Sequence, residues 1–471
     1  MTPADTGRAA AQLLDALSDP IDDALGRGRR TLVSATVEVE PIDPSAVAFG
    51  SRLASDRWFC WEQPDRGGFA LAGVGSAWEV ASRGQERFAD VGEGCAEIAR
   101  DRIASEPAGL PEGAGPVWVG GFAFDPEGGG SSQWSSLPPA LAVMPELSLS
   151  RSEAGSHLTL AAVVMPGSTA DQHLARARAR VESLRDRSLP MLDPHPAGET
   201  TIRSARPPSA FEESVERAVE RIAAGGVEKV VLAREVLVEA PAAHDPAALY
   251  AALRQLFPSC FCFCVGTPEA AFLGASPELL VRRSGAVAAT VALAGSTRRS
   301  ADPSIDDHLG EQLAHNAKDR HEHEIVVRRI ERALRPHSVW VEAAPQPGLV
   351  RVANIQHLAT PIHAQLAEPR SAIELASLLH PTPAVGGEPR AEALAAIAEL
   401  EDMDRGWYAG PVGWMDTTED GEMCVALRSA LVRDRTAHLY AGGGIVAESD
   451  PAAELAETEV KLGALLPLVA G

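Results

Sequence analysis

The stretch HNAKDRHEHEIVVRRI, which begins at His315, concentrates imidazole and carboxylate side chains that could bind a metal ion. On a helix, His321 and His323 are two positions apart and point in different directions, so they form a poor chelating pair. The stretch also lacks the HExxH spacing of zinc proteases. We therefore expect the histidines to be structural or to lie behind the site. Asp319 and Glu322 are predicted to share one helical face with His315 and to offer oxygen ligands.

A second carboxylate face lies in the last predicted helix, AAELAETEVKL. Glu454, Glu457 and Lys461 follow the spacing i, i+3, i+7 and so point to the same side of a helix. Asp450 and Pro451 supply an N-cap and a first-turn proline. The same pattern also fits an ordinary solvated helix face. If the two carboxylate faces meet, their hard oxygen ligands suit Mg²⁺, which keeps several waters and bridges to an anionic substrate.

Isolated charges inside apolar strands form a third group. Lys229 in VEKVVLAR, Arg428 in VALRSAL and Glu278 in GASPELLV each interrupt an apolar run, where an unpaired charge is costly. Lys229 could simply lie at a strand end and face water. If Lys229 and Glu278 instead lie on neighbouring strands, they could act as a base and an acid. The residue pattern by itself therefore predicts a Mg²⁺-assisted reaction on a small anion.

The charge of the chain limits its partners. It has 471 residues, 42 Lys and Arg against 65 Asp and Glu, and a net charge of −23. This charge disfavours nucleic acids and anionic membranes, so an anionic substrate requires a local cluster of basic side chains. We find no apolar run long enough to span a membrane and no signal-peptide core, and we expect a cytoplasmic protein. Cys260, Cys262 and Cys264 alternate along a predicted strand and are interpreted as buried thiols.

The order of predicted elements indicates an α+β protein with large antiparallel sheets. Residues 1–30 are expected to form an Ala-rich helix or a loose tail, and short strands follow from residue 31 onward. The Pro-rich residues 188–210 are predicted to be a surface connection. In the second half, AFLGASPELLVRR and EMCVALRSALVRD are each expected to form a strand, and residues 305–335 are expected to form one long helix.

A series of motifs resembles the chorismate-utilising enzymes, the family that includes anthranilate synthase component I. The matching runs are EKVVLARE, FLGASPELL, LAGSTRR, KDRHEHEIVV, VANIQHLATPI, LHPTPAVGGEPR, DRGWYAGPVGWMD, EMCVALRSAL and AGGGIVAESDPAAELAETEVKL, in that order over residues 205–467. The resemblance implies an α/β sandwich with two large antiparallel sheets, flanked by helices, and an active site between them. It further implies that residues 31–471 form one chorismate-binding catalytic domain. Residues 1–30 are left outside it as a helical extension or tail.

The resemblance also implies a role for each candidate residue. Lys229 matches the general base that activates water for attack at C2 of chorismate, and Glu278 matches the acid that protonates the departing C4 hydroxyl. The metal ligands would be Glu322, Glu454 and Glu457, with Mg²⁺ as the cofactor. Asp319 stands where some relatives have another acid. The implied substrate-binding residues are Thr382, Ala384, Tyr408, Arg428, Gly442, Gly444 and Lys461.

Within the family, the motifs are most similar to those of the isochorismate synthases. Ammonia-using relatives lack the water-activating lysine, so Lys229 argues against them. Salicylate synthases keep that lysine, eliminate pyruvate as well, and usually read LAGT where Ser296 ends LAGS here. The alternatives are a salicylate synthase and an inactive carboxylate-binding relative. The resemblance implies a monomer that serves siderophore, menaquinone or other salicylate-related biosynthesis.

Overall fold

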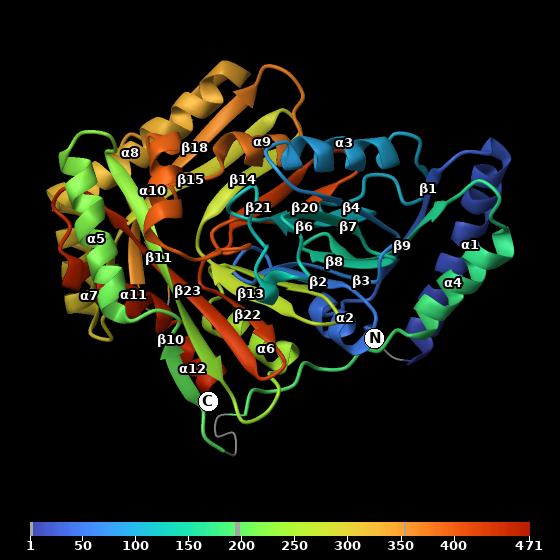
Figure 1. The fold of residues 1–471 in the computed structure, drawn as a ribbon. Coiled ribbons are helices and arrows are strands. Elements are labelled where there is room, and N and C mark those ends of the chain that lie inside the picture. The colour runs from blue at the N-terminus through green and yellow to red at the C-terminus, as the bar shows by residue number, and fades with distance from the viewer. Residues whose placement is uncertain (1–2, 194–197, 353–354) are drawn as a thin grey trace.

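The computed structural model describes residues 3–193, 198–352 and 355–471. Two large β-sheets fill the centre of the molecule, and helices cover them from outside (Figure 1). The sheets face each other, since the rings of Phe69 and Trp414, one from each sheet, have centroids 5.8 Å apart. One hydrophobic core contains side chains of both sheets. The predicted α+β class, with two large antiparallel sheets flanked by helices, is confirmed.

The larger sheet has 13 strands, and only the β1–β5 pair among them is parallel in the part of the chain that the structure describes. In spatial order its strands are β10 (Thr201–Ser204), β11 (Lys229–Glu239), β23 (Thr436–Ile445), β22 (Ser429–Arg433), β13 (Ala271–Ser276), β12 (Phe261–Gly266), β2 (Trp58–Gln63), β3 (Phe69–Val74), β8 (Leu147–Ser152), β9 (Gly155–Val164), β1 (Thr31–Val39) and β5 (Ile103–Ser105), with β19 (Gly387–Glu388) paired to β11.

The smaller sheet has 10 strands and its pairs are antiparallel. Its order is β16 (Ser338–Ala343), β18 (Ile355–Leu366), β15 (Val287–Arg298), β14 (Leu279–Ser284), β21 (Gly421–Val425), β20 (Pro411–Asp416), β6 (Val117–Phe122), β7 (Ala140–Met144) and β4 (Trp78–Ser82), with β17 (Gly348–Arg351) paired to β18. Strands from before residue 165 therefore take part in both sheets. How the chain divides into domains stays a prediction.

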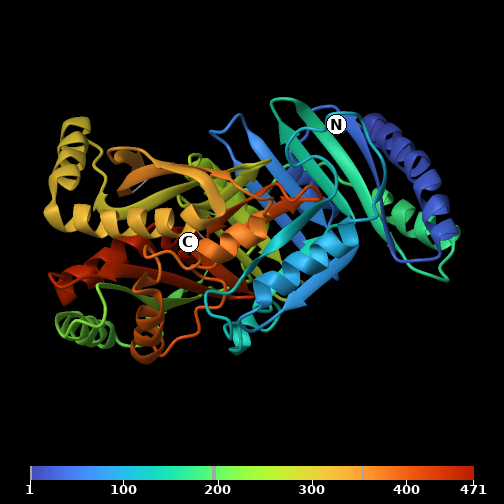
Figure 2. The same ribbon diagram turned by 90° about the horizontal axis from the view of Figure 1, so that it is seen from above.

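Helices cover the outer faces of both sheets (Figure 2). Near the candidate residues, α8 packs on β15, α11 on β23 and α10 on β11, while α3 and α9 lie side by side over the smaller sheet. The helices are α1 (Pro3–Arg27), α2 (Pro44–Ser51), α3 (Arg87–Ala99), α4 (Ala170–Glu182), α5 (Pro208–Ala223), α6 (Pro246–Leu256), α7 (Pro303–His315), α8 (Ala317–Leu334), α9 (Ala372–Leu379), α10 (Arg390–Leu400), α11 (Pro451–Leu462) and α12 (Leu466–Ala470).

Two segments that were each predicted as one strand cross from one sheet to the other. The first is β13, which ends in the larger sheet, and β14, which begins in the smaller sheet after Pro277 and Glu278. The second is β21 in the smaller sheet and β22 in the larger sheet, separated by residues 426–428. The single-strand predictions were therefore wrong. Proline has no N–H for a sheet ladder, so Pro277 was a signal for the first break.

The two crossings are hydrogen-bonded to each other, and we call this junction the seam (residues 275–278 and 425–428). The amide of Ala275 donates to the carbonyl of Arg428 at 3.1 Å, and the amide of Val425 donates to the carbonyl of Glu278 at 3.0 Å. Arg428 has φ +48°, a left-handed conformation that costs energy for a residue with a side chain. The seam therefore fixes the backbones of Glu278 and Arg428 against each other.

Three further predictions need correction or completion. Residues 305–335 are two helices, because Asn316 ends α7 and its side chain caps α8 by accepting from the Asp319 amide at 3.1 Å. His315 therefore belongs to α7 and does not share a helical face with Asp319 and Glu322. Residues 188–210 include strand β10 and the start of α5, although residues 194–197 of that prediction lie outside the described residues.

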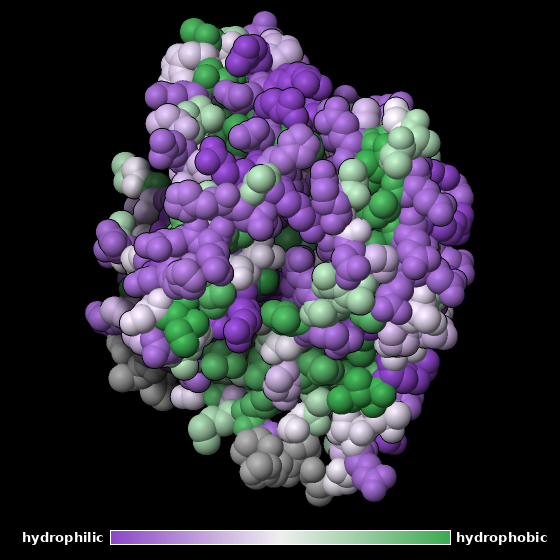
Figure 3. Space-filling model, turned by 90° about the vertical axis from the view of Figure 1, so that its left-hand side faces the viewer, coloured by the Kyte–Doolittle hydropathy of each residue, from purple (hydrophilic) through white to green (hydrophobic). Residues whose placement is uncertain are grey.

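The N-terminal segment is a helix rather than a loose tail over residues 3–27. Its buried side chains recur at helical spacing and enter a core shared with β1 and α4: they are Ala9, Leu13, Leu17, Ile21 and Ala24. All six cysteines are free and buried, which confirms the interpretation of the alternating cysteines. Among the described helices, none combines the length and apolar character needed to cross a bilayer. The face that carries α5, α7, α8 and α11 is mostly hydrophilic (Figure 3).

Candidate active site

A cavity of about 100 Å³ opens at the seam, between β11 and β23 of the larger sheet, β15 and β18 of the smaller sheet, and helices α8 and α11. Side chains from segments more than 200 residues apart converge here. The candidate residues that line it are Glu278, Glu322, Ala384, Tyr408, Arg428, Gly442, Gly444, Glu457 and Lys461. The remaining three candidates lie behind the lining residues. Lys229 contacts Glu322, Thr382 contacts Glu278, and Glu454 contacts Lys318, which itself lines the cavity.

Lys229 is completely buried at the first position of β11, with 0% of its surface exposed. Its Nζ lies 2.7 Å from Glu322 Oε1, yet no acceptor among the described residues meets it in hydrogen-bond geometry. The alternative that Lys229 faces water at a strand end is therefore wrong. An ammonium group that is buried with incomplete hydrogen bonding is costly, and a lysine held in this way against a carboxylate that lines a cavity is a candidate for a functional role.

Glu278 lies in the seam and is also buried. Burial raises the pKa of Glu278 to about 8, although Lys229 and the Thr382 hydroxyl oppose this rise. Thr382 Oγ1 lies 3.5 Å from Glu278 Oε1, a long contact. Because a carboxyl group with this pKa is mostly protonated at neutral pH, Glu278 can donate a proton there.

Three lysine–glutamate pairs surround the cavity. Lys229 contacts Glu322 at 2.7 Å, Lys318 contacts Glu454 at 3.0 Å, and Lys461 contacts Glu457 at 2.7 Å. These are the three lysines of the whole chain, whereas its other basic residues counted with them are arginines. Arginine serves well in most surface ion pairs, but of the two basic residues only lysine loses its proton readily. The concentration of lysine at one cavity therefore points to chemistry there.

The carboxylates around the cavity are crowded. Burial raises the pKa of Asp319 to about 6, and the nearby Glu322 and Glu457 add to this rise. Burial and Glu457 raise the pKa of Glu454 as well. Burial would also raise the pKa of Glu457, but Lys461 and the Ser296 hydroxyl, which donates at 3.0 Å, hold it at about 2.

The residue types around the cavity suit a divalent cation, because carboxylate oxygens are the ligands that Mg²⁺ prefers. In the arrangement described, each of the three glutamates faces a lysine. Among the described residues, no three His, Cys, Asp or Glu side chains form a group that could hold a metal ion. The metal ligation therefore stays a prediction, and the residues that would provide it are Glu322, Glu454 and Glu457.

The opposite wall of the cavity carries groups suited to an anion. Arg428 donates from Nη2 to His357 Nε2 at 3.1 Å, and His357 Nδ1 lies 3.3 Å from the carbonyl of Gly295. Burial lowers the pKa of His357 to about 3, so the ring is neutral and its Nδ1–H donates to Gly295. Burial raises the pKa of Tyr408 to about 12, which keeps its hydroxyl protonated and able to donate.

The glycines of β23 and the lysine of α11 close the cavity. Lys461 donates to the carbonyl of Gly442 at 2.7 Å, which joins α11 to the strand below it. Gly444 has no room for a side chain, because a Cβ there would lie 2.4 Å from Glu322 Oε1 and 2.9 Å from Lys229 Cε. The absence of a side chain at this position lets the Lys229–Glu322 pair approach the strand.

Several residues of the cavity were missed from the sequence. His357, Lys318 and Arg405 line it, although each lies inside a run that carried the family resemblance. A lone histidine in the apolar run of β18 was the signal for His357. The other histidines behave as expected: His323 is buried and bonds Thr360 Oγ1 at 2.7 Å, and His321 is exposed.

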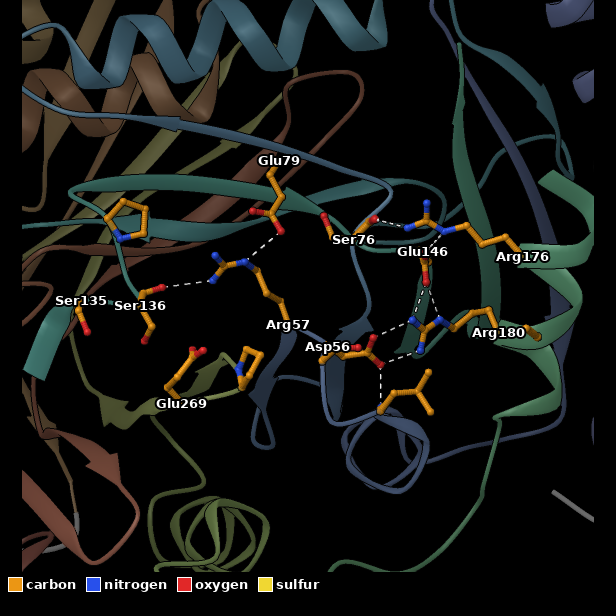
Figure 4. A pocket seen from close by; sticks show the side chains of 15 residues that line it. Asp56, Arg57, Ser76, Glu79, Ser135, Ser136, Glu146, Arg176, Arg180 and Glu269 are labelled. Carbon is orange, nitrogen blue, oxygen red and sulfur yellow. Dashed lines mark hydrogen bonds and ion pairs between the residues drawn. The ribbon is translucent and has the colours of Figure 1, made fainter. Parts of the chain in front are cut away.

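A larger cleft, of about 820 Å³, lies elsewhere, between the start of β2, α4 and the β12–β13 turn (Figure 4). Each arginine that lines it already contacts a carboxylate: Arg57 with Glu79, Arg176 with Glu146, and Arg180 with Asp56. Its charges neutralise one another, so it offers little attraction to a dianion. The small cavity at the seam, where buried charges are incompletely satisfied, is the better candidate.

We expect Gly444→Ala to destabilise the protein by about 1–3 kcal/mol, because the new methyl group must displace the Lys229–Glu322 pair. Denaturant unfolding would measure the change. Gly226→Ala is the matched control, since its Cβ would meet no atom within 4 Å, and it should change the free energy of unfolding by less than about 0.5 kcal/mol. Equal stabilities of the two variants would contradict the close packing at Gly444.

Comparison with known proteins places the chain in a family. The family model described as "Chorismate binding enzyme" matches residues 19–470. The chain is 38% identical over 461 residues to the salicylate biosynthesis isochorismate synthase of Pseudomonas aeruginosa, which covers 97% of this chain and 94% of that protein. It is 32% identical over 447 residues to the isochorismate synthase MenF of Bacillus subtilis, which covers 93% and 94%.

Solved structures of related enzymes support the same family assignment. The menaquinone-specific isochorismate synthase of Escherichia coli superposes with a TM-score of 0.78 at 27% identity, covering 96% of this chain and all of that one. Anthranilate synthase component I of Streptococcus pneumoniae gives a TM-score of 0.66 at 21% identity, covering 84% and 92%, which supports the shared fold. Because the family model and both relatives extend over more than nine-tenths of its length, the chain belongs to the chorismate-binding enzymes.

Proposed function

We propose that this protein is an isochorismate synthase, which converts chorismate to isochorismate reversibly. Water adds at C2 of the ring, a double bond shifts, and the C4 hydroxyl leaves with a proton as water, so the atoms balance. The observation that carries the proposal is that two buried groups meet at one cavity: Lys229, which contacts the cavity residue Glu322, and Glu278, which lines the cavity and whose pKa burial raises to about 8. The names of the relatives at 38% and 32% identity support the same activity.

Lys229 is assigned as the base. In neutral form its Nζ accepts a proton from the attacking water, and its incomplete hydrogen bonding leaves it available for this task. Glu278 is assigned as the acid, because hydroxide is a poor leaving group and requires protonation as the C4–O bond breaks. General acid and general base catalysis each contribute about 10²–10⁴-fold in rate.

The dianionic substrate requires cationic and hydrogen-bonding groups that an acidic protein provides only locally. Arg428, Tyr408 and Lys461 are assigned to its carboxylates, together with the backbone at Gly442 and Gly444. Thr382, which contacts Glu278, and Ala384, which lines the cavity, are also assigned to substrate binding. The neutral ring of His357 holds the Arg428 guanidinium in place. A guanidinium group fixed in this way is suited to bind a carboxylate through two parallel hydrogen bonds.

Glu322, Glu454 and Glu457 would hold Mg²⁺, with Asp319 beside them. The metal would supply positive charge for the ring carboxylate of the substrate. Burial is the main cause of the raised pKa of Asp319 and Glu454, and neighbouring carboxylates add to it; this second contribution supports the assignment, because like charges at close range favour a bound cation.

A salicylate synthase is the second candidate, since it would form isochorismate and then eliminate pyruvate. Ser296 occupies the position that distinguishes the two in the family resemblance, and its hydroxyl bonds Glu457. The Pseudomonas relative is named a salicylate biosynthesis isochorismate synthase. A role in a salicylate pathway therefore does not require that the same protein eliminates pyruvate.

Product analysis tests the proposal. The purified protein would be incubated with chorismate and Mg²⁺, with and without EDTA, and the products separated while pyruvate is assayed. We expect isochorismate without pyruvate, and loss of the activity on chelation. Salicylate with an equal amount of pyruvate would favour the salicylate synthase, and no conversion would leave a carboxylate-binding relative.

Lys229→Ala should lower kcat by about 10²–10⁴-fold, because the base is lost. Steady-state kinetics with chorismate would measure it, and circular dichroism would confirm the fold. Glu228→Ala is the matched control, since Glu228 is the exposed neighbour in sequence and its loss should leave kcat unchanged. Normal turnover by Lys229→Ala would remove lysine as the base.

The activity should fall as pH rises through about 8, because Glu278 has a raised pKa of about 8 and donates a proton only below it. Measurement of kcat between pH 6 and pH 10 would show this limb. In Glu278→Gln, which cannot release a proton, the remaining activity should be lower and this limb absent. An activity of the parent protein that increases through pH 9 would contradict the assignment of Glu278 as the acid.

Glu457→Gln should raise the Mg²⁺ concentration needed for half-maximal activity by at least about tenfold, because a charged ligand becomes neutral. Titration of activity with Mg²⁺ would measure this. Glu448→Gln, at an exposed glutamate before the same helix, provides the control and should titrate like the parent. An unchanged titration for Glu457→Gln would remove this residue from the metal site.

A further inference from the structure

The strand that carries Lys229 has a gap along one edge. On one side β11 pairs with β23 along almost its whole length. On the other side it pairs with β19 at Lys229 and Val230 and with β10 from Val236 to Glu239. Between these two short partners, no strand of the described residues faces β11 at positions 231–235. Backbone N–H and C=O groups at a buried strand edge need other partners.

A buried ion pair fills this gap. The amide of Ala233 donates to Glu401 Oε1 at 2.7 Å, and Arg405 Nη2 donates to the carbonyl of Val231 at 2.8 Å. Arg405 Nε also donates to Glu401 Oε2 at 2.9 Å. The side chains of Arg405 and Glu401 are 3% and 1% exposed. The pair therefore bonds to β11 at the positions where a neighbouring strand would do so.

The same arginine joins β11 to a second segment of the cavity. Arg405 Nη1 donates to the carbonyl of Val385 at 2.9 Å, and the amide of Val231 donates to the carbonyl of Gly386 at 2.8 Å. Its guanidinium stacks on the ring of Phe124, with Cζ 4.1 Å from the ring centroid. All three guanidinium nitrogens are thus engaged, and the segment of residues 381–386, which carries Thr382, is tied to the strand of the base.

We infer that Glu401 and Arg405 are positioning residues for the reaction proposed above, on which this inference rests. Their pair fixes Lys229, at the start of β11, relative to residues 381–386, where Thr382 contacts the acid Glu278. It also fixes the segment that leads from Arg405 to Tyr408. A displacement of about 1 Å between catalytic groups can cost about 100-fold in rate, so a rigid connection between these segments acts directly on turnover.

A purely structural role makes a different prediction. If the pair only stabilised the fold, its weakening would lower the free energy of unfolding and leave kcat per folded molecule unchanged. A positioning role requires that kcat falls and that the backbone of β11 near Lys229 loosens at the same time. Measurement of both quantities on the same variants separates the two roles.

Arg405→Lys is the main variant, because it keeps the charge next to Glu401 but cannot reach the carbonyls of Val231 and Val385 together. Arg180→Lys is the matched control. Arg180 is an equally buried arginine that donates to both oxygens of Asp56, at 2.7 and 2.8 Å (Figure 4), but it contacts no residue of the seam cavity. Glu401→Gln is a second, isosteric variant, which distinguishes a positioning role from a purely structural role if Arg405→Lys fails to fold.

The experiment combines kinetics with hydrogen exchange measured by mass spectrometry. In Arg405→Lys we expect kcat for chorismate to fall about 100-fold, with a much smaller change in KM, and the amides of residues 229–235 to exchange at least about tenfold faster. Glu401→Gln should shift both quantities in the same direction. Arg180→Lys should leave kcat and the exchange of residues 229–235 as in the parent.

Two outcomes would overturn the inference: a kcat for Arg405→Lys and Glu401→Gln within about twofold of the control, or a loss of kcat without faster exchange in residues 229–235. Failure of the proposed function gives a different result. In that case the parent protein itself would not convert chorismate, while the exchange of residues 229–235 would still respond to Arg405→Lys.

Discussion

The site depends on the hydrogen bonds that join two chain crossings between the sheets. At the seam, the backbone of Glu278 bonds the backbone of Val425, and Arg428 bonds Ala275. The acid and the arginine assigned to the substrate are therefore fixed by main-chain geometry before any side-chain contact is made. Helices α8 and α11 then bring Glu322 and Glu457 to the same junction. A site built at a junction of two sheets is held more rigidly than one built on surface loops.

Burial at this junction gives the side chains their chemical character. Removal of Glu278 from water raises its pKa and keeps it a proton donor at neutral pH. The same burial keeps His357 neutral, so that its ring accepts from Arg428 and donates to Gly295. Each of these effects costs stability, because buried polar and charged groups lose hydration. The chain places these groups together at one cavity, and its only three lysines lie around the same cavity.

Sequence alone predicted which residues come together at the cavity better than it predicted how they are arranged. The i, i+3, i+7 spacing of Glu454, Glu457 and Lys461 predicted one helical face, and the structure has that helix. Lys229 and Glu278 were recognisable as charges inside apolar runs. The crossing at Arg428 was not predictable from periodicity, because VALRSAL contains no glycine or proline, and the turn uses a left-handed arginine. His357 gave only a weak signal, since its partners are about 70 residues away.

The Glu401–Arg405 pair shows why such contacts escape sequence analysis. Its spacing of i, i+4 is typical of an ordinary exposed helix pair worth about 0.3–0.5 kcal/mol, and only the tertiary fold makes it buried. A strand could have filled the same gap beside β11 with backbone hydrogen bonds. It would also have placed main chain where Val385 and Arg405 now border the cavity. Two side chains satisfy the edge of β11 while leaving the cavity open at Val231, Val385 and Arg405, which line it.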